Sequence, residues 1–326
     1  MEEESILINN TLANGFQILN YDEEKRLSDE EKIEYYKKLK YHLSCGNNAK
    51  KILSYAQKCE KHNWFTKKHI DKLIKYDLEV ENQFLIPTNT PIIYASSHQD
   101  FYDHINIIKA IPGHAIILNS CEIPWYIKMV LNFNGVELVD RQSTQSRFNS
   151  KNNLMGYLAN GKSIVIFPEG TYNCSPNRLL LPLKSGTIDI AKKMQVPIIP
   201  TVQFYNHDTT KMDGKNKVIS CKVKFGNPIY VDYNDEIKDK KRELRDSMAY
   251  MIYEEIEKKG NYSRTTISPL EYQSYVQSRI ATIKKMGVNY EHEVATIYGA
   301  DDYTYIDYPI NAVSIEPITR TKKRKN

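Results

Sequence analysis

Residues 92–104 have the sequence IIYASSHQDFYDH, in which an apolar run changes abruptly to polar side chains. The run Ile92–Ala95 is typical of a buried strand, and the segment from Asp103 to Ala110 is a helical candidate. In open α/β sheets, ligand sites gather outside the carboxyl ends of the strands. This stretch therefore predicts an α/β fold and a candidate site in the turn between strand and helix.

The same alternation of strand and helix continues toward the C-terminus. Short apolar runs predict strands at Ala115–Leu118, Val136–Val139, Ile164–Phe167, Val196–Val202 and Val223–Phe225. Helical candidates lie between them at residues 124–133, 144–158 and 186–194, and a long helix is expected from near Asn234 to Gly260. Apolar strands that alternate with helices indicate a sheet covered by helices on both faces.

The segments that flank this α/β pattern differ from it. Ser28 and Glu31 form a capping-box signature at the start of a helical pattern, and no strand signal occurs up to about Val80. We therefore expect an N-terminal helical unit over residues 1–82, an α/β domain over 83–260 and a C-terminal extension over 261–326. The extension is rich in tyrosine, and one helix is expected within it at residues 272–283.

The composition is close to that of an ordinary globular chain. Of 326 residues, 41% are hydrophobic and 26% are charged, and no run of 18 apolar residues predicts a transmembrane helix. The five cysteines are scattered and never in a CxxC spacing, which disfavours a disulfide framework or a zinc knuckle. The acidic start Met-Glu-Glu-Glu is unlike a signal peptide. We expect a cytoplasmic protein, soluble or peripheral at the inner face of the membrane.

The net charge of +5 is concentrated at the C-terminus. The last residues carry five bases and no acid after Glu316 (Arg320, Lys322, Lys323, Arg324 and Lys325). Without them the chain has 40 basic and 40 acidic residues, so a folded surface that coats nucleic acid is disfavoured. Two interpretations of the tail stay open. It either attracts the protein to an anionic membrane surface, at about 1 kcal/mol for each base, or is a solvated terminus.

The turn at residues 96–104 contains a candidate acid–base pair. His98 and Asp103 are five residues apart, so the carboxylate can fold back to the imidazole if His98 lies in the turn and Asp103 in the first helical turn. Such a pair fixes the tautomer and leaves the second nitrogen available to take a proton. Two alternatives are an ordinary polar turn and a metal-dependent hydrolase that uses His98, Asp100, Asp103 and His104 as ligands.

A second polar turn, Phe167–Thr171, follows another predicted strand. Gly170 allows a close backbone approach, Glu169 can accept a hydrogen bond from a substrate hydroxyl, and Thr171 can donate to an anion. Alone, this turn is unremarkable, and its value lies in its place at the carboxyl end of a strand in the same sheet.

One apparent phosphate-binding motif is misleading. Residues 156–163 have the spacing of a P-loop, GxxxxGKS, but a P-loop requires a strand before the loop and a helix after it. Here a predicted helix precedes the loop and a predicted strand follows it. We interpret Gly161 as the end of that helix.

Four blocks together resemble the glycerolipid acyltransferase superfamily, which includes glycerol-3-phosphate and 1-acylglycerol-3-phosphate acyltransferases. The blocks are the His98-x4-Asp103 pair, Gly135–Arg141, Phe167–Thr171 and Val196–Pro200, in the order and spacing of the family. Residues 181–186 and 225–229 are also similar to family segments, so the resemblance extends from about Phe84 to Gly260. The resemblance implies a mixed, mostly parallel sheet covered by helices.

The resemblance also implies a mechanism. His98 would be the general base that removes a proton from an acceptor hydroxyl, and Asp103 would orient the imidazole. The acyl donor would be an acyl thioester of coenzyme A or acyl carrier protein, the acceptor a lipid or glycerol phosphate, and no cofactor or metal is expected. The residues implied in holding the acceptor are Glu169, Gly170 and Thr171, with Arg141 and Lys184 supplying positive charge.

The sequence departs from the family pattern at Tyr172. The family usually has an arginine there, which is thought to bind the acceptor's phosphate, and a phenol cannot replace a bidentate guanidinium. Either Arg141, Arg178 or Lys184 compensates, or the acceptor is a glycolipid or a saccharide. A non-catalytic, lipid- or carrier-binding member of the same fold is a further alternative, although His98 and Asp103 are both intact.

Overall fold

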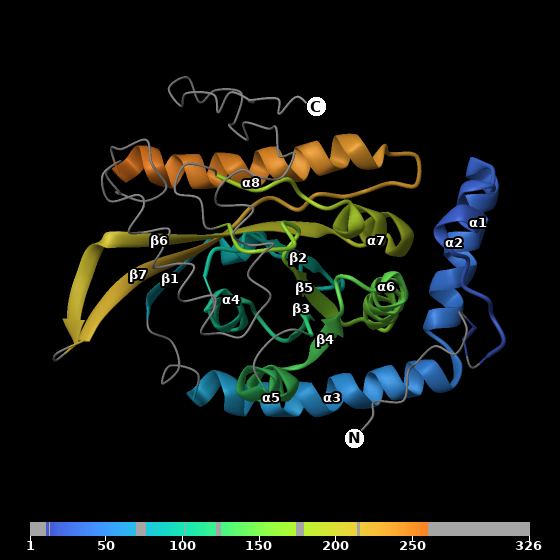
Figure 1. The fold of residues 1–326 in the computed structure, drawn as a ribbon, viewed down its shortest axis with the longest axis horizontal. Coiled ribbons are helices and arrows are strands. Elements are labelled where there is room, and N and C mark those ends of the chain that lie inside the picture. Colours follow the sequence, from blue (N-terminus) through green and yellow to red (C-terminus); the bar gives the residue numbers. More distant parts are fainter. Residues whose placement is uncertain are drawn as a thin grey trace, which may run out of the picture.

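A computed structural model of the chain describes residues 11–12, 14–69, 76–100, 102–121, 125–173, 179–213 and 216–259. Seven strands in these ranges form one sheet, in the order β1-β7-β6-β2-β5-β3-β4 (Figure 1). The pairing of β6 with β7 is antiparallel, and every other neighbouring pair is parallel. The predicted mixed, mostly parallel α/β sheet is confirmed. The strands are β1 Tyr76–Glu81, β2 Ile93–Ser96, β3 Ala115–Ser120, β4 Val136–Val139, β5 Ser163–Ile166, β6 Ile198–Asp213 and β7 Asn216–Phe225.

The described helices cover both faces of this sheet. Figure 1 shows α8 along one side and α3 with α5 along the other. No helix of the described residues is both long and apolar enough to cross a membrane. The helices are α1 Tyr21–Lys25, α2 Asp29–Leu43, α3 Gly46–His69, the short 3₁₀ helix η2 Gln83–Leu85, α4 Asp103–Ala110, α5 Trp125–Asn134, α6 Thr144–Ala159, α7 Gly186–Met194 and α8 Ile237–Lys259.

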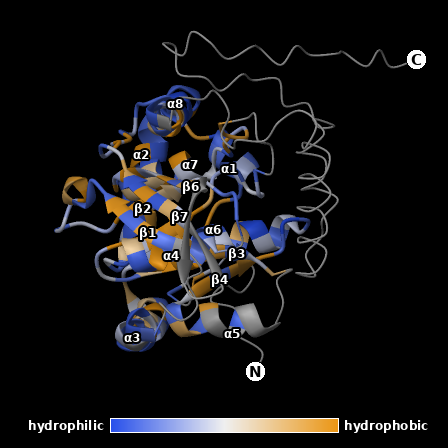
Figure 2. Ribbon diagram, turned by 90° about the vertical axis from the view of Figure 1, so that its left-hand side faces the viewer, coloured by the Kyte–Doolittle hydropathy of each residue, from blue (hydrophilic) through white to orange (hydrophobic). Residues whose placement is uncertain are grey.

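Alternation along the central strands explains why both faces are buried. In β2, Ile93 and Ala95 belong to the core beneath α6, α7 and α8, whereas Tyr94 belongs to the core beneath α4. Successive side chains of a strand point to opposite faces, so a short strand that is apolar throughout supplies two cores. Figure 2 shows the apolar residues concentrated in the sheet and on the inner sides of the helices.

One expectation about the N-terminal region is wrong. Residues up to about Val80 were expected to contain helices only, but Tyr76–Glu81 forms the edge strand β1, paired with residues 219–224 of β7. Glutamates are poor strand formers. Here Lys222 pairs with Glu81 at 2.6 Å and with Glu79 at 3.7 Å, so the acidic strand is stabilised by its neighbour. The domain limits themselves stay predictions, and the helix expected at 272–283 lies outside the described residues.

The remaining elements agree closely with the sequence pattern. The helix predicted from Ser28 begins there, with both hydrogen bonds of the capping box formed between Ser28 and Glu31. The helix α6 ends at Ala159 and β5 begins at Ser163, which confirms that the P-loop-like spacing has the wrong order of elements. The strands β6 and β7 extend further than predicted because their outer residues are largely polar and carry no apolar signal.

The N-terminal helices hold the helix that carries the first motif. Carbonyl groups at and just beyond the C-terminal end of α4 accept hydrogen bonds from side chains of two N-terminal elements. Asn63 of α3 donates to Gly113 over 3.0 Å, and Lys67 donates to Ile111 over 2.6 Å. Gln83 donates to the carbonyl of Ala110 over 2.6 Å. Because the last carbonyls of a helix lack partners within it, these side chains fix where α4 ends.

A chain of charged side chains, of which Lys193 is buried and the others partly buried, joins α1 and α2 to α6 and α7. Lys193 of α7 pairs with Glu24 of α1 at 2.5 Å, and Tyr36 of α2 donates to the same carboxylate. Lys193 also pairs with Asp189 at 3.4 Å, which contacts Lys151 of α6. Burial alone would raise the pKa of Asp189, but Lys151 and Lys193 hold it below its ordinary value. The N-terminal helices are thus linked to a lysine that borders the pocket described below.

Candidate active site

The two polar turns predicted from the sequence meet at one edge of the sheet. His98 follows the carboxyl end of β2, and Glu169 follows the carboxyl end of β5. Since β2 and β5 are parallel neighbours, their carboxyl ends lie side by side. The turn after β2 and the turn after β5 therefore form a single site.

His98 and Asp103 form the predicted pair. Nδ1 of His98 lies 2.9 Å from Oδ2 of Asp103, and α4 begins at Asp103. His98 is 7% exposed and Asp103 is fully buried. Because Asp103 occupies Nδ1, Nε2 is the ring nitrogen that can exchange a proton with a substrate. The expected placement of the pair is confirmed, and its catalytic role stays a prediction.

Asp103 is held by several donors. Its Oδ2 also accepts hydrogen bonds from the backbone amides of Gln99 (2.5 Å) and Asp100 (2.8 Å), and Tyr205 donates its hydroxyl to Oδ1. Burial raises the pKa of Asp103 to about 7, and the nearby charge of Asp100 acts in the same direction. The hydrogen bonds from Tyr205, Asp100 and Gln99 oppose that shift.

Aromatic rings surround the imidazole of His98. The ring centroid of Phe167 is 4.2 Å away, that of Tyr172 is 4.0 Å away, and His104 contacts the imidazole edge-on at 5.2 Å. These contacts restrict the rotation of His98 to the orientation that Asp103 requires. Tyr172, at the position where the family usually has arginine, is only 7% exposed.

Glu169 does not occupy the place expected for a residue that holds the acceptor. Its Oε1 accepts a hydrogen bond from the backbone amide of His98 (2.9 Å), and its Oε2 accepts one from Leu181 (2.7 Å). It is 1% exposed and is absent from the residues that line the pocket. The carboxylate therefore holds the backbone of the His98 turn and is not part of the pocket wall.

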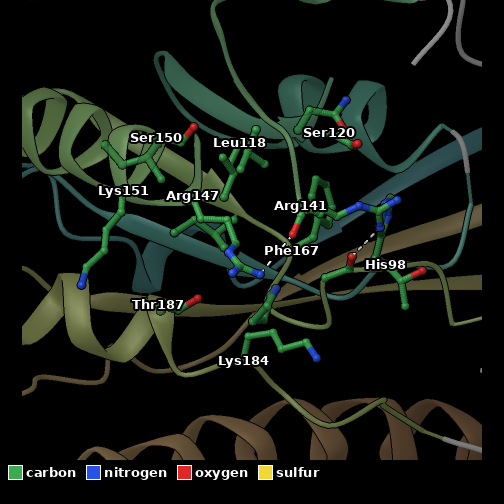
Figure 3. A pocket seen from close by; sticks show the side chains of 18 of the residues that line it. His98, Leu118, Ser120, Arg141, Arg147, Ser150, Lys151, Phe167, Lys184 and Thr187 are labelled. Atoms are coloured by element: carbon green, nitrogen blue, oxygen red, sulfur yellow. Dashed lines mark hydrogen bonds between the residues drawn. The ribbon is translucent and has the colours of Figure 1, made fainter. Parts of the chain in front are cut away.

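A pocket of about 580 Å³ opens beside His98 (Figure 3). In the figure His98 lies toward one end of the pocket and Lys151 toward the other. The described residues that line the pocket include four cations and no acid. The cations are Arg141, Arg147, Lys151 and Lys184, and apolar side chains line much of the remainder (Leu118, Val139, Leu154, Ile166, Phe167 and Ile190).

The sequence analysis identified only part of this lining. It named Arg141, Gly170 and Lys184, which lie together: Nη1 of Arg141 donates to the carbonyl of Gly170 over 3.0 Å, and the Lys184 side chain packs against Gly170. It missed Arg147 and Lys151, which lie one turn apart on α6. A signal for them existed, because positions 147, 150, 151 and 154 share one helical face, and all four line the pocket.

Thr171 provides a further polar group. It is 3% exposed and lines the pocket, and its hydroxyl has no hydrogen-bond partner among the described residues. A buried hydroxyl without a partner is costly in an empty site and is satisfied when a ligand supplies an acceptor. Of the other residues named from the sequence, Arg178 lies outside the described residues.

The geometry does not support the metal-site alternative. Within the described ranges, no three or more His, Cys, Asp or Glu side chains are arranged to hold a metal ion, and this includes His98, Asp100, Asp103 and His104. The Asp103 carboxylate is instead surrounded by hydrogen-bond donors. His98 and Asp103 form a hydrogen-bonded pair.

Comparisons with known proteins agree with this geometry. Residues 77–203 match the family model described as Acyltransferase. The 1-acyl-sn-glycerol-3-phosphate acyltransferase alpha of Ovis aries is 29% identical over 143 residues, which cover 43% of this chain and 49% of the relative. The Homo sapiens protein of that name is 27% identical over 165 residues, covering 49% of this chain and 58% of the relative.

The chain spans about half the length of these curated relatives. Among solved structures, the 1-acyl-sn-glycerophosphate acyltransferase PlsC of Thermotoga maritima matches with a TM-score of 0.46 and 17% identity, over 68% of this chain and 88% of that chain. The similarity rests on the match of residues 77–203 and on the order of the four sequence blocks within and around that range. Over this range, the chain is similar to the glycerolipid acyltransferases.

Proposed function

We propose that this protein is an O-acyltransferase that moves an acyl group from a thioester to a hydroxyl group of a glycerol-phosphate-type lipid, as the names of its relatives suggest. The observation that carries the proposal is the His98–Asp103 pair at the edge of a pocket that has both cationic and apolar walls. Coenzyme A and acyl carrier protein are both suitable carriers of the acyl group.

In the proposed reaction, Nε2 of His98 takes the proton of the acceptor hydroxyl as its oxygen attacks the thioester carbonyl carbon. A carbon–oxygen bond forms, the carbon–sulfur bond then breaks, and the departing sulfur takes the proton back from His98. The products are an ester and a free thiol. Asp103 keeps the imidazole in the required tautomer and stabilises the imidazolium, and general-base assistance of this kind contributes about 10²–10⁴ in rate.

The pocket lining supports an anionic acceptor over an uncharged one. Arg141, Arg147 and Lys184 supply positive charge, and guanidinium groups suit phosphate oxygens. The hydroxyl of Thr171 can donate to an oxygen of the same substrate. The family's usual arginine is absent at position 172, where this chain has tyrosine. Arg141, Arg147 and Lys184 supply positive charge in its place. The apolar walls suit a fatty chain.

The test is a transfer assay with a labelled acyl donor and purified wild-type protein. Acyl-coenzyme A and acyl carrier protein would each be offered with lysophosphatidic acid, glycerol 3-phosphate and a neutral glycolipid. We expect transfer to a phosphate-bearing acceptor. The variant His98→Ala should lose transfer while its circular dichroism and melting temperature stay close to those of the wild type.

The matched control is His62→Ala, because His62 is a histidine on α3 that does not line the pocket. This variant should keep full activity. A folded His98→Ala variant with wild-type activity would contradict the proposed mechanism, and transfer to the glycolipid alone would move the acceptor to an uncharged class.

A further inference from the structure

A tyrosine on β6, the strand next to β2, contacts Asp103. Tyr205 lies on β6, 102 residues after Asp103 in the chain, and is 5% exposed. Because β6 pairs in parallel with β2, with Thr201 opposite Ser96, Tyr205 lies further along β6 in the direction in which β2 leads to the His98 turn. The Tyr205 hydroxyl donates a hydrogen bond to Oδ1 of Asp103.

The surroundings of this hydroxyl fix the direction in which it donates. Nδ2 of Asn106 donates to Oη of Tyr205 over 3.0 Å, and an amide nitrogen cannot accept a hydrogen bond. The sulfur of Cys221 also contacts this hydroxyl, but a thiol is a weak acceptor beside a carboxylate, so the single proton of the phenol is directed at Asp103. The backbone amides of Gln99 and Asp100, and His98 itself, all contact Oδ2, so Tyr205 is the donor that serves Oδ1.

We propose that Tyr205 is a positioning residue for acyl transfer: it completes a Tyr205–Asp103–His98 chain and keeps the Asp103 carboxylate ionised, so that His98 can act as the base. The proposal rests on the function proposed above, and it assigns no contact between Tyr205 and the substrate. Tyr205 acts through Asp103.

The charged and titratable groups around Asp103 agree with this role. Burial and the charge of Asp100 raise the pKa of Asp103 to about 7, and the hydrogen bond from Tyr205 opposes them. From α4, His104 faces the ring of His98, and from β7 the buried thiol of Cys221 lies near Asp103, its own pKa raised by burial. Neither of these supplies a donor to Oδ1 in the described part of the chain. Loss of the Tyr205 hydroxyl should therefore raise the pKa of Asp103 further.

The experiment compares Tyr205→Phe with the wild type across pH 5.5–9, by kcat and KM with a soluble acyl thioester. We expect the acidic limb of kcat/KM to move up by about one pH unit, which corresponds to the strength of one charge-assisted hydrogen bond. At pH 7 kcat should fall by about fivefold and should recover toward pH 9, with both KM values unchanged. A purely structural role would give the same loss at every pH.

The matched control is Tyr94→Phe. Tyr94 is a buried tyrosine on the neighbouring strand β2; its ring packs on Phe225, and it is not among the donors to the Asp103 carboxylate described above. This variant should keep the wild-type pH profile. An unchanged profile in Tyr205→Phe, or a loss that is independent of pH, would overturn the proposal.

A second measurement does not depend on turnover. Carbon-13 NMR of carboxyl-labelled aspartate, with Asp103→Asn identifying the signal, reports the ionisation of Asp103 directly. Its midpoint should be higher in Tyr205→Phe, even if the true substrate differs from the one proposed. An unchanged midpoint overturns the role of Tyr205, whereas a shifted midpoint without transferase activity overturns only the proposed function.

A milder variant covers the case in which Tyr205→Phe does not fold. Asn106→Leu has a similar volume and leaves the phenol in place, but removes the donor that directs its proton toward Asp103. We expect a shift of the Asp103 midpoint in the same direction and of smaller size. A midpoint equal to the wild type's in this variant would contradict the directed hydrogen bond.

Discussion

Oε1 of Glu169 accepts a hydrogen bond from the backbone amide of His98 over 2.9 Å, and this bond connects the polar turn after β2 to the polar turn after β5. The connection is reinforced by the carbonyl of His98, which accepts a hydrogen bond from the amide of Asn173 over 2.7 Å. The turn after β5 thus holds the backbone of the histidine on both sides. We therefore expect Glu169 to affect catalysis through the position of His98, which it helps to fix.

The variant Glu169→Gln tests this assignment. Glutamine has one acceptor oxygen where glutamate has two, so either the amide of His98 or that of Leu181 would lose its acceptor. A buried donor left without a partner costs about 1–3 kcal/mol. We expect a lower melting temperature and a lower kcat, with KM for the acceptor little changed. The control is Glu255→Gln, a buried acid on α8 that pairs with Lys222 and Lys258. A rise in KM alone would instead indicate direct contact with the acceptor.

The activity should depend on pH through Asp103. Because burial raises the pKa of Asp103 to about 7, the carboxyl takes up a proton as the pH falls through that value and no longer stabilises the His98 imidazolium. We expect kcat/KM to decline on the acidic side with an apparent midpoint near pH 7, measured at constant ionic strength. The midpoint belongs to the coupled pair. The remaining activity of Asp103→Asn should not decline on the acidic side. If the decline persists in this variant, the titrating group is not Asp103.

The same shift affects stability. A carboxyl group whose pKa is higher in the folded state than in the unfolded state contributes stability at low pH. That contribution is lost as the pH rises from about 4 to about 7. Urea denaturation of the wild type and of Asp103→Asn would measure this. Between pH 4 and pH 8, the free energy of unfolding of the wild type should fall relative to that of Asp103→Asn. A constant difference would contradict the raised pKa.

The position of Tyr172 leads to a prediction about the acceptor. Tyr172→Phe keeps the ring that packs on His98, so we expect nearly full activity. Tyr172→Arg would place a cation against an imidazole that must itself become positive, and kcat should fall at least about tenfold without a lower KM for lysophosphatidic acid. Kinetics with lysophosphatidic acid and a neutral glycolipid would check this. Improved use of glycerol phosphates by Tyr172→Arg would show that the natural acceptor is of another kind.

Arg147 is expected to bind the acceptor. It lines the pocket near Arg141, to whose carbonyl it donates a hydrogen bond over 3.1 Å. A hydrogen bond to a charged group is worth about 1.5–3 kcal/mol, so Arg147→Gln should raise KM for a phosphate-bearing acceptor by about 10–100-fold and leave kcat nearly unchanged. Arg242→Gln on α8, outside the pocket lining, is the control. Equal effects of the two variants would remove Arg147 from the acceptor site.

The surroundings of Gly135 explain why the block Gly135–Arg141 begins with glycine. Its φ angle is +100°, and an added Cβ would lie 2.5 Å from Cδ1 of Ile116 and 3.3 Å from Cys59. Gly113 has a φ of +75° but open space around it, so Gly113→Ala measures the backbone strain alone. We expect Gly113→Ala to cost about 1 kcal/mol and Gly135→Ala about 1–3 kcal/mol more in free energy of unfolding. Equal losses would mean that Ile116 moves away without cost.

The positions of the sheet strands and of the His98–Asp103 pair followed from the sequence because both depend on local chemistry. A short apolar run such as Ile92–Ala95, bounded by polar residues and proline, favours a buried interior strand, and the five-residue spacing lets one turn bring the carboxylate to the imidazole. The edge strand Tyr76–Glu81 was missed because its stability comes from lysines about 140 residues away on β7, as in the pair Lys222–Glu81.

The tertiary structure alone decided which groups surround that pair. Glu169 is a plausible acceptor for a substrate hydroxyl until the fold places two backbone amides on its carboxylate. Tyr205 is one of 24 tyrosines in the sequence, and no spacing relates it to Asp103 across 102 residues. The sequence by itself determined the fold class, the family resemblance and the proximity of His98 to Asp103. The supporting hydrogen bonds depend on side chains that only the packing of β2 between β5 and β6 brings together. The cationic wall of the pocket likewise combines residues from α6 and from the segments after β4 and before α7, which only the fold brings to one place.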